Sequence, residues 1–477
     1  MRYVVAAMGV MVVSLVAVAA EGRPNFIVIN IDDLGYADIG PFGSKINRTP
    51  HLDRMAREGR KLTSFYAAPV CSPSRAMLMT GSYPKRCLPI PHVLFPAHDV
   101  GLSPKEITIA KILQSHGYAT AIIGKWHLGD QPEFLPNKHG FDYHFGLPYS
   151  NDMGPAEDGA KSSLGQPLPK PKADGQPPLP LLRNQTVLKR VRPEDQQAMV
   201  ENYTQQAIAF ITANKKKPFF LYMAHNAVHF PLYPGQAWAG KSPHGLYSDW
   251  VEEVDDSVGQ ILDTLRQQQL AQQTLVIFTS DNGGTVRGSN APLRGFKGST
   301  WEGGVRVPTI AWWPEKIPAG TQSDAITGMF DILPTLAALA GAKLPKDRII
   351  DGKNIWPILA GTKDARGHDT FYYYRGLRLE AVRQGDWKLQ IAHPVKKDDT
   401  DFNTPKLYNL KTDIGETQDV AAKHPDVVKQ LQQLVQAMEN DLGRDGPAQG
   451  SRELGKVPNP QPLIRNDGTI RPGFEPK

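Results

Sequence analysis

Cysteine is nearly absent from this chain, which has only Cys71 and Cys87 among its 477 residues. Two cysteines cannot supply the several crosslinks of a disulfide-based fold. A chain of this length is long enough to be stabilised by a large hydrophobic core instead. The single disulfide that the sequence allows would join Cys71 to Cys87, but we expect Cys87 to be a small, buried apolar residue.

Long hydrophobic runs are confined to the first twenty residues. Arg2 precedes an apolar run at 4–20, and the run ends in small residues just before Glu21. A positive charge, an apolar stretch and small residues before a cleavage point are typical of an export signal. We therefore expect a signal peptide at 1–20 and an exported protein, periplasmic or secreted, without a stable membrane span. A retained N-terminal anchor is the alternative.

A strong excess of one charge is also missing. The chain has 54 Lys and Arg against 48 Asp and Glu, and the resulting net charge of +6 is spread along the sequence. We expect no nucleic-acid partner, because proteins that bind nucleic acid usually carry clustered basic residues. The modest balance indicates simple solubility, with a preference for anionic substrates as the alternative.

Apolar segments rich in β-branched residues alternate with helical patterns over most of the chain. Residues 25–31 read Asn-Phe-Ile-Val-Ile-Asn-Ile, which suits a strand buried on both faces. Further strands are predicted at 120–123, 218–223 and 274–279, and helices at 50–57, 107–116 and 249–269. This alternation predicts an α/β fold with a large, mostly parallel mixed sheet sandwiched by helices.

The pattern changes after about residue 364, which predicts a second structural unit. Four short strands at 370–374, 379–383, 387–391 and 407–410 precede an amphipathic helix at 424–442. We expect a large domain at 21–363, a small C-terminal subdomain of antiparallel sheet and helix at 364–442, and a poorly ordered tail at 443–477. Residues 154–193 are rich in Pro, Gly and Lys, and predict a long loop or an extended excursion, which is either functional or a variable surface insertion.

Three polar motifs follow predicted strands directly. They are Asp32-Asp33, Lys125-Trp126-His127 and Asp281-Asn282. Because the carboxyl ends of parallel strands meet at one edge of a sheet, we expect the three motifs to form one site. Adjacent carboxylates are costly unless a cation neutralises them, and hard oxygen ligands favour Ca²⁺ or Mg²⁺ over zinc.

The segment Cys71-Ser72-Pro73-Ser74-Arg75 resembles the signature of the type I sulfatases, a branch of the alkaline phosphatase superfamily in which the cysteine becomes Cα-formylglycine. Four further segments resemble family motifs: Gly124-Lys125-Trp126-His127-Leu128-Gly129, Asp281-Asn282-Gly283, Gly298-Ser299-Thr300-Trp301-Glu302-Gly303-Gly304, and Leu407-Tyr408-Asn409-Leu410 with Gly415-Glu416-Thr417. Pro148-Tyr149-Ser150-Asn151-Asp152-Met153-Gly154 is similar to the arylsulfatase A and N-acetylgalactosamine-6-sulfatase group. The likeness runs from residue 25 to about 421 and implies an alkaline phosphatase-like fold.

The resemblance implies a role for each matching residue. Cys71, as formylglycine, would be the nucleophile in its hydrated gem-diol form, and Arg75 would stabilise the diol. Ca²⁺, with Mg²⁺ as the alternative, would be bound by Asp32, Asp33, Asp281, Asn282 and an oxygen of modified Cys71. Lys125 and Lys297 would hold the sulfate oxygens, His127 would assist the second half-reaction, and Ser150 would lie near the bound sulfate. His229 would protonate the leaving alcohol, while His225 is its rival and otherwise a substrate ligand.

Hydrolysis of a sulfate ester is therefore the expected function. The expected substrate is a sulfated carbohydrate, such as a 6-sulfated galactose or N-acetylgalactosamine. A formylglycine-generating or sulfatase-maturating enzyme is the expected protein partner. Two alternatives stay open: hydrolysis of a phosphodiester or phosphonate monoester on the same scaffold, and non-catalytic binding of sulfated glycans if Cys71 is never modified. Two lysines and two histidines suit sulfate but do not exclude a phosphorus ester.

Overall fold

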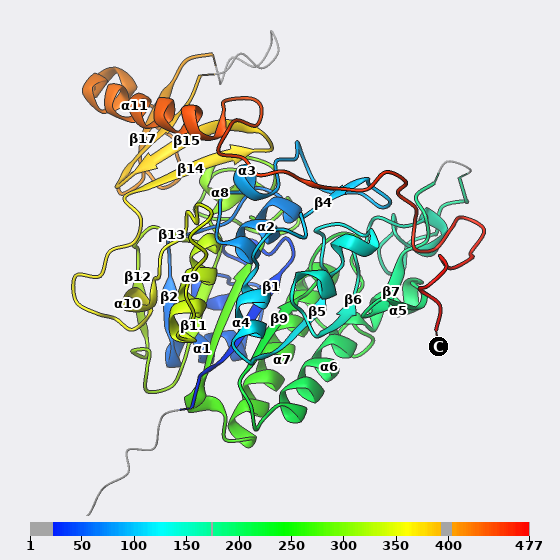
Figure 1. The fold of residues 1–477 in the computed structure, drawn as a ribbon. Coiled ribbons are helices and arrows are strands. Elements are labelled where there is room, and N and C mark those ends of the chain that lie inside the picture. Colours follow the sequence, from blue (N-terminus) through cyan, green and yellow to red (C-terminus); the bar gives the residue numbers. More distant parts are fainter. Residues whose placement is uncertain (1–21, 173–174, 393–402, 477) are drawn as a thin grey trace, which may run out of the picture.

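The structure is a computed structural model that describes residues 22–172, 175–392 and 403–476. A large sheet with helices forms the body of the molecule, and a small sheet with the long helix α11 (Pro425–Leu442) lies at one end of it (Figure 1). The predicted signal peptide at 1–20 lies outside the described residues. None of the helices in the described ranges has the length and hydrophobicity that crossing a bilayer requires.

The large sheet has a parallel centre and mixed edges. The parallel strands are β1 (Asn25–Ile31), β5 (Ala119–Gly124), β6 (Tyr143–Gly146), β9 (Phe219–Ala224) and β10 (Thr274–Ser280). The edge strands are β2 (Arg60–Leu62), β7 (Pro180–Arg183), β8 (Thr186–Arg190), β11 (Thr309–Trp312) and β12 (Thr321–Ser323). Their order is β12-β2-β11-β10-β1-β9-β5-β6-β7-β8. The predicted α/β fold with a mostly parallel mixed sheet is confirmed.

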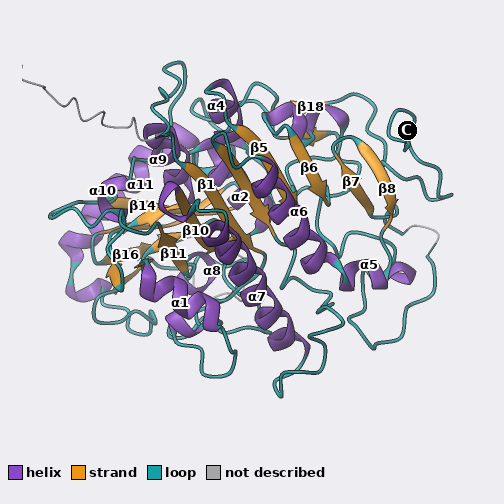
Figure 2. Ribbon diagram, turned by 90° about the horizontal axis from the view of Figure 1, so that it is seen from below, coloured by secondary structure: helices purple, strands orange, loops and turns teal. Residues whose placement is uncertain are grey.

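Both faces of this sheet are buried, because hydrophobic side chains point alternately to either side of the strands. In β1, Phe26 and Val28 belong to one core, whereas Ile27 and Ile29 belong to the other. The first core is covered by α2 (Cys71–Thr80), α4 (Ile109–Ser115) and α9 (Ile332–Leu339). The second is covered by α1 (Pro50–Glu58), α6 (Met199–Ala213) and α7 (Leu246–Gln267), and Figure 2 shows α6 and α7 lying over one face of the sheet.

Short elements complete the body. The short helices are α3 (Pro84–Cys87), α5 (Pro193–Gln197), α8 (Glu302–Val305) and α10 (Trp356–Leu359). Two small sheets pair β3 (Phe65–Tyr66) with β13 (Thr327–Gly328), and β4 (Val100–Gly101) with β18 (Gly455–Lys456).

The C-terminal subdomain has the predicted architecture. Its strands are β14 (Thr370–Arg375), β15 (Arg378–Gln384), β16 (Trp387–Gln390) and β17 (Lys406–Asn409), which pair antiparallel in chain order. The helix α11 packs on β15 and β16, and buries Leu431, Val435 and Leu442. The predicted antiparallel sheet with one helix is therefore confirmed.

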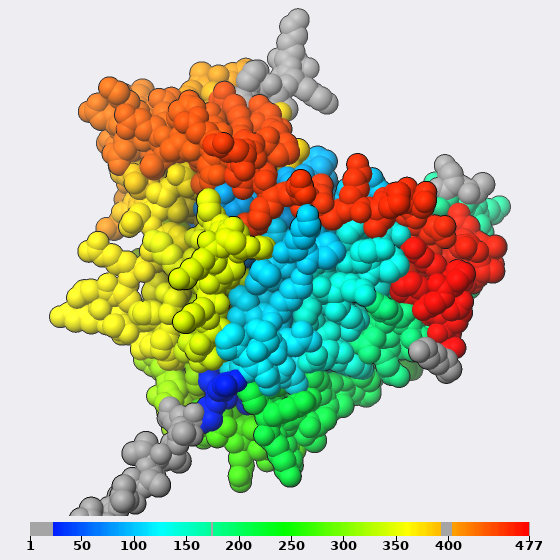
Figure 3. All heavy atoms as spheres, viewed as in Figure 1, coloured from blue at the N-terminus to red at the C-terminus, as the bar shows by residue number. Residues whose placement is uncertain are grey.

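Two expectations about irregular segments are wrong. Residues 154–193 do not form one long loop, because β7 and β8 add two strands to the edge of the large sheet. The tail after residue 443 is not loose: β18 pairs with β4, and Leu463, Ile464 and Phe474 pack on apolar side chains of the body. Figure 3 shows the tail, in red, lying along the surface of the body. Both segments are ordered by apolar partners that lie far away in the sequence.

A buried group of charges joins the subdomain to the body. Lys388 of β16 donates to the Thr300 carbonyl at 2.8 Å and to Glu302 Oε1 at 3.0 Å, and its ammonium lies 2.8 Å from Glu416 Oε1. The hydroxyls of Tyr66 and Tyr373 donate to the two oxygens of Glu302 at 2.5 and 2.8 Å. The side chains of Lys388, Glu302 and Glu416 are fully buried. These contacts fix the segment before Glu302 against the small sheet.

Candidate active site

Four neighbouring parallel strands carry polar residues just beyond their carboxyl ends. Asp32 and Asp33 follow β1, Lys125 follows β5, and Asp281 follows β10. The segment that contains His229 follows β9, which lies between β1 and β5. The predicted motifs are thus brought together at one edge of the sheet, where open α/β sheets bind their ligands.

Backbone contacts hold these strand ends close to one another. The amide of Lys125 donates to the Ala224 carbonyl at 2.7 Å, and the amide of Asp281 donates to the Ile31 carbonyl at 2.9 Å. Gly124 permits the first contact, since its φ is 115° and a Cβ there would lie 1.9 Å from the Ala224 oxygen. A side chain at this position would force β5 and β9 apart.

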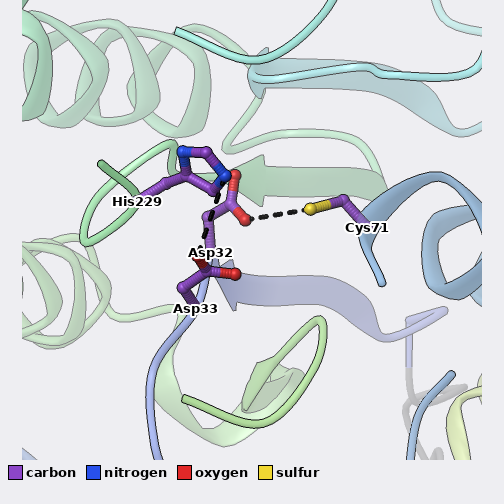
Figure 4. A group of neighbouring side chains, drawn as sticks. All are labelled: Asp32, Asp33, Cys71 and His229. Carbon is purple, nitrogen blue, oxygen red and sulfur yellow. Dashed lines mark hydrogen bonds and ion pairs between the residues drawn. The ribbon is translucent and has the colours of Figure 1, made fainter. Parts of the chain in front are cut away.

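The helix α2 begins at Cys71 and is buried along its whole length. Residues four apart lie on the same face of a helix, so Cys71 and Arg75 both face the strand ends. Cys71 Sγ lies 3.3 Å from Asp32 Oδ1 (Figure 4). Arg75 donates to Asp281 Oδ2 from Nε at 3.0 Å and from Nη2 at 2.8 Å. The N-terminus of α2 adds a partial positive charge that favours an anion beside Cys71.

Cys71 and Cys87 are both free and buried, so the disulfide that the sequence would allow is not formed. Burial and the neighbouring Asp32 charge raise the pKa of the Cys71 thiol far above its ordinary value. A thiol that stays protonated is a poor nucleophile. The site therefore disfavours a thiolate mechanism at Cys71.

Each of three buried carboxylates has a cationic partner. The pairs are Asp32 with Lys125, Asp33 with Lys297 at 2.6 Å, and Asp281 with Arg75 at 2.8 Å. Burial alone would raise the pKa of Asp32, but the Lys125 ammonium and the other cations lower it well below its ordinary value. Burial and the Asp32 charge raise the pKa of Asp281 to about 6 in spite of Arg75. Since the charges of the three ion pairs cancel, an added divalent cation would give the site a net positive charge and make it attractive to an anionic substrate.

Two of these carboxylates, those of Asp32 and Asp33, belong to a candidate metal site. Ligand atoms of Asp32, Asp33, Cys71 and His229 lie within 4.8 Å of one another (Figure 4). Asn282 extends this set, because its Nδ2 donates to Asp33 Oδ1 at 2.8 Å. The buried Oδ1 of Asn282 has no hydrogen-bond partner among the described residues. An unpartnered amide oxygen beside carboxylates fits a hard cation such as Ca²⁺ or Mg²⁺.

His127 has one ring nitrogen available to the site. Its Nε2 lies 2.9 Å from the Leu94 carbonyl and therefore donates, which leaves Nδ1 as the acceptor. Nδ1 is buried and has no partner within the described ranges. Burial, together with the charges of Lys125 and Arg75, lowers the pKa of His127 well below its ordinary value. His127 is thus a neutral imidazole that can accept a proton at Nδ1.

His229 lies at the edge of this group. Its Nδ1 is 2.5 Å from the Phe230 carbonyl, and its Nε2 is 3.7 Å from Asp33 Oδ2 (Figure 4). With Nδ1 donating to a carbonyl, Nε2, on the side of Asp33, is the nitrogen left to exchange a proton.

The structure does not bring His225 to the site. It continues the alternation of Leu221 and Met223, whose side chains point into the core beneath α6 and α7. Its Nε2 lies 3.5 Å from Ser257 Oγ of α7, and its ring packs 6.0 Å from Tyr203 of α6. Burial lowers the pKa of His225 to about 3, so the imidazole ring is uncharged at neutral pH. The expectation that His225 contacts substrate is therefore unsupported.

A cavity of about 330 Å³ opens beside Cys71. Its wall is formed by Val70, Cys71, His92, Val93, Phe95, His127, Ser150, Asp152, Met153, His229, Lys297 and Gly298. The Ser150 hydroxyl accepts from Lys125 Nζ at 3.2 Å and lies 3.4 Å from His229 Nδ1. Five of the expected site residues thus line one cavity, while Arg75 and Lys125 lie behind it in ion pairs.

Sequence reasoning missed the segment 92–95 and Asp152. The Leu94 amide donates to Ser72 Oγ at 3.2 Å, and the Leu94 carbonyl accepts from His127. The segment is therefore fixed by α2 and in turn orients His127, while Phe95 lines the cavity. No motif marks 92–95, whereas Asp152 lies inside a segment already similar to known relatives and could have been found there.

Family models match almost the whole described chain. The Sulfatase model matches residues 24–342, which include all the site residues above. The model for the C-terminal region of aryl-sulfatase matches residues 366–462, which include the small sheet and α11.

Curated relatives and solved structures agree with this match. Steryl-sulfatase of Mus musculus is 38% identical over 76% of this chain and 69% of its own length. Arylsulfatase A of Bos taurus is 37% identical over 95% of both chains, and N-acetylgalactosamine-6-sulfatase of Mus musculus is 38% identical over 79% of this chain and 74% of its own. The crystal structure of Ps i-CgsB in complex with k-i-k-neocarrahexaose has a TM-score of 0.75 at 32% identity, covering 87% of this chain and 92% of that chain. The chain belongs to the sulfatase family and is a sulfuric ester hydrolase.

Proposed function

We propose that the protein removes sulfate from a sulfated carbohydrate, with Cys71 converted to Cα-formylglycine as its nucleophile. The position of Cys71 carries the proposal, since it begins a buried helix, faces Asp32 and lines the cavity. A thiolate is disfavoured there, whereas an aldehyde hydrate offers two hydroxyls on one carbon. One hydroxyl attacks sulfur and releases the alcohol. The other then loses its proton and expels sulfate as the carbonyl re-forms.

The ion that suits the site is Ca²⁺, with Mg²⁺ as the alternative. Asp32, Asp33, Asp281, Asn282 and an oxygen of modified Cys71 would hold it. Such a cation lowers the pKa of a nearby hydroxyl and screens the charge of a bound sulfate.

The remaining site residues bind charge and move protons. Arg75 stabilises the diol from the same helix face as Cys71, and Lys125 and Lys297 provide positive charge for the sulfate oxygens. His229 protonates the leaving alcohol, because an alkoxide is a poor leaving group. His127 assists the second half-reaction by accepting a proton at its unpartnered Nδ1.

A carbohydrate is the proposed leaving group, and a 6-sulfated galactose or N-acetylgalactosamine is the first candidate. An N-acetylgalactosamine-6-sulfatase and the neocarrahexaose-bound enzyme are among the proteins similar to this chain. The similarity to steryl-sulfatase makes a sterol the main competitor. The polar side chains His92, Ser150 and Asp152 can hydrogen-bond a sugar, and they lie in the cavity wall beside the apolar side chains of Val93, Phe95 and Met153.

Maturation and export belong to the same proposal. Cys71 is only 2% exposed, so a formylglycine-generating or sulfatase-maturating enzyme must act before the chain folds around it. The signal at 1–20 would direct the protein to the periplasm or out of the cell.

Two measurements test the proposal. Mass spectrometry of the peptide that contains Cys71, from protein made by its natural host, should show formylglycine; an unmodified thiol in active protein would exclude this nucleophile. Rates on paired aryl sulfate and aryl phosphodiester substrates should favour the sulfate. Faster phosphodiester hydrolysis would support the alternative reaction, and glycan binding without turnover would indicate a non-catalytic binder. Chelation should abolish activity, and Ca²⁺ should restore it.

A further inference from the structure

Asp152 lines the active-site cavity, and no hydrogen bond to its carboxylate is found among the described residues. It lines the cavity together with Ser150 and Met153. Its Oδ1 is buried, yet no described residue donates a hydrogen bond to it. A buried oxygen of this kind costs free energy unless a ligand supplies the donor.

The isolation of Asp152 is unusual within this site. Asp32, Asp33 and Asp281 each have a cationic partner, as described above. The nearest lysine with a contact to Asp152 is Lys161, whose ammonium donates to the Asp152 backbone carbonyl at 2.6 Å and not to the carboxylate. The group of candidate metal ligands does not include Asp152 either. Its carboxylate is therefore free to accept a hydrogen bond from substrate.

The negative charge of Asp152 argues for a contact with the leaving group and not with the sulfate. Ser150, two residues earlier, contacts Lys125 and His229, which belong to the sulfate-binding and proton-donating end of the site. A carboxylate repels sulfate, so it would weaken binding if it touched the scissile group. A cavity of about 330 Å³ is at the small end for ligand pockets and suits one sugar ring.

We infer that Asp152 is a specificity-determining residue that accepts a hydrogen bond from a free hydroxyl of the sulfated sugar ring. This inference rests on the proposed function and adds a chemical requirement to it. A substrate without a hydroxyl near the ester, such as an aryl or steryl sulfate, leaves the carboxylate unpaired and is bound less well. A second anionic group at this position of the ring is rejected by the charge of Asp152.

The test compares kcat/KM for a sulfated monosaccharide and for 4-nitrophenyl sulfate in the wild type, Asp152→Ala and Asp152→Asn. The ratio of sugar to aryl kcat/KM should fall about 10- to 100-fold in Asp152→Ala, because a hydrogen bond to a charged group is lost. Asp152→Asn keeps an acceptor oxygen and should fall less. Glu133→Ala, which removes an exposed carboxylate outside the cavity, is the matched control and should keep the wild-type ratio.

A deoxy sugar sulfate identifies the hydroxyl. The wild type should prefer the parent sugar over the deoxy analogue by about the same factor, and Asp152→Ala should lose this preference. A sugar-to-aryl ratio of kcat/KM that stays unchanged in Asp152→Ala would overturn the inference. If both values fall by the same factor, the role of Asp152 is structural. A wild type that cleaves aryl sulfate but no sugar sulfate would instead refute the proposed carbohydrate substrate, and the inference with it.

Discussion

The molecule contains two buried groups of charges that serve different ends. The active-site cluster consists of Asp32, Asp33, Asp281, Arg75, Lys125 and Lys297. The interface cluster consists of Glu302, Glu416 and Lys388 with the hydroxyls of Tyr66 and Tyr373. Both combine carboxylates and ammonium groups that are largely removed from water. They differ in what lies next to them: a cavity in the first case and the small C-terminal sheet in the second.

The pKa shifts of their carboxyls are mixed in both clusters. In the interface cluster, burial would raise the pKa of Glu302, but Lys388, Arg306 and Arg383 lower it to about 2, whereas burial raises the pKa of Glu416 in spite of Lys388. In the active-site cluster, burial raises the pKa of Asp281 to about 6, whereas Lys125 and the other cations overcome burial and lower the pKa of Asp32. The surroundings of each cluster therefore separate their roles: one joins two parts of the fold, and the other lies beside a cavity that can admit an ion and a substrate.

Three unpartnered atoms lie beside the active-site cluster. Asn282 Oδ1, His127 Nδ1 and Asp152 Oδ1 have no hydrogen-bond partner among the described residues. Each such atom costs about 1–3 kcal/mol in the folded state. A bound ion or substrate can supply partners for these three atoms.

Removal of Lys388 should break the interface cluster and have the largest destabilising effect. In Lys388→Met, Glu416 stays buried without its cation and Glu302 keeps Arg306 at 3.4 Å, which should lower the free energy of unfolding by about 3–5 kcal/mol. Urea and thermal unfolding measure this change. Lys411→Met removes an exposed lysine of the same subdomain and should be close to neutral. Equal midpoints for the two variants would show that the interface cluster does not stabilise the fold.

Removal of Lys297 should instead affect catalysis. Lys297 lines the cavity, and its side chain is 20% exposed. In Lys297→Ala, kcat/KM for an aryl sulfate should fall by about 10²–10³-fold, or roughly 2.7–4 kcal/mol of transition-state stabilisation. The unfolding midpoint should change less than in Lys388→Met. The control is Lys343→Ala, at an exposed lysine, and a loss of less than tenfold in Lys297→Ala would remove Lys297 from the catalytic residues.

The parts of this structure that sequence predicts are those with a local signal. The strand at Asn25–Ile31 and the carboxylates after it follow from a short apolar run and the geometry of parallel sheets. The partners of Glu302 could not be predicted, because Lys388 and Tyr66 lie far from it in the chain. The packed tail was missed for the same reason, since Phe474 is ordered by apolar residues of the body. His225 is different, because the alternation along β9 already indicates that it faces the core.

Glu253 of α7 sharpens the comparison, because it is a buried carboxyl without a cation. It is 4% exposed and accepts a hydrogen bond from the Gly235 amide at 2.7 Å, and no ion pair to it is found among the described residues. Burial, with a smaller contribution from the charges of Glu201 and Asp256, raises the pKa of Glu253 to about 8. In the unfolded chain a glutamate has a pKa of about 4.3. The folded state therefore binds the proton more tightly than the unfolded state.

The sign of the pH dependence follows because the pKa of Glu253 is higher in the folded state than in the unfolded state. The contribution of Glu253 to stability is complete below about pH 4 and is lost as the pH rises toward about 8. Glu253→Gln keeps an acceptor for the Gly235 amide but cannot ionise, so it should match the wild type near pH 4 and be more stable by about 4–5 kcal/mol at pH 8. Urea unfolding at several pH values measures this difference, and Glu133→Gln, at an exposed glutamate, should show none. A constant offset between Glu253→Gln and the wild type across this range would mean that Glu253 does not titrate. Charge pairing would then not be what distinguishes Glu253 from Glu302.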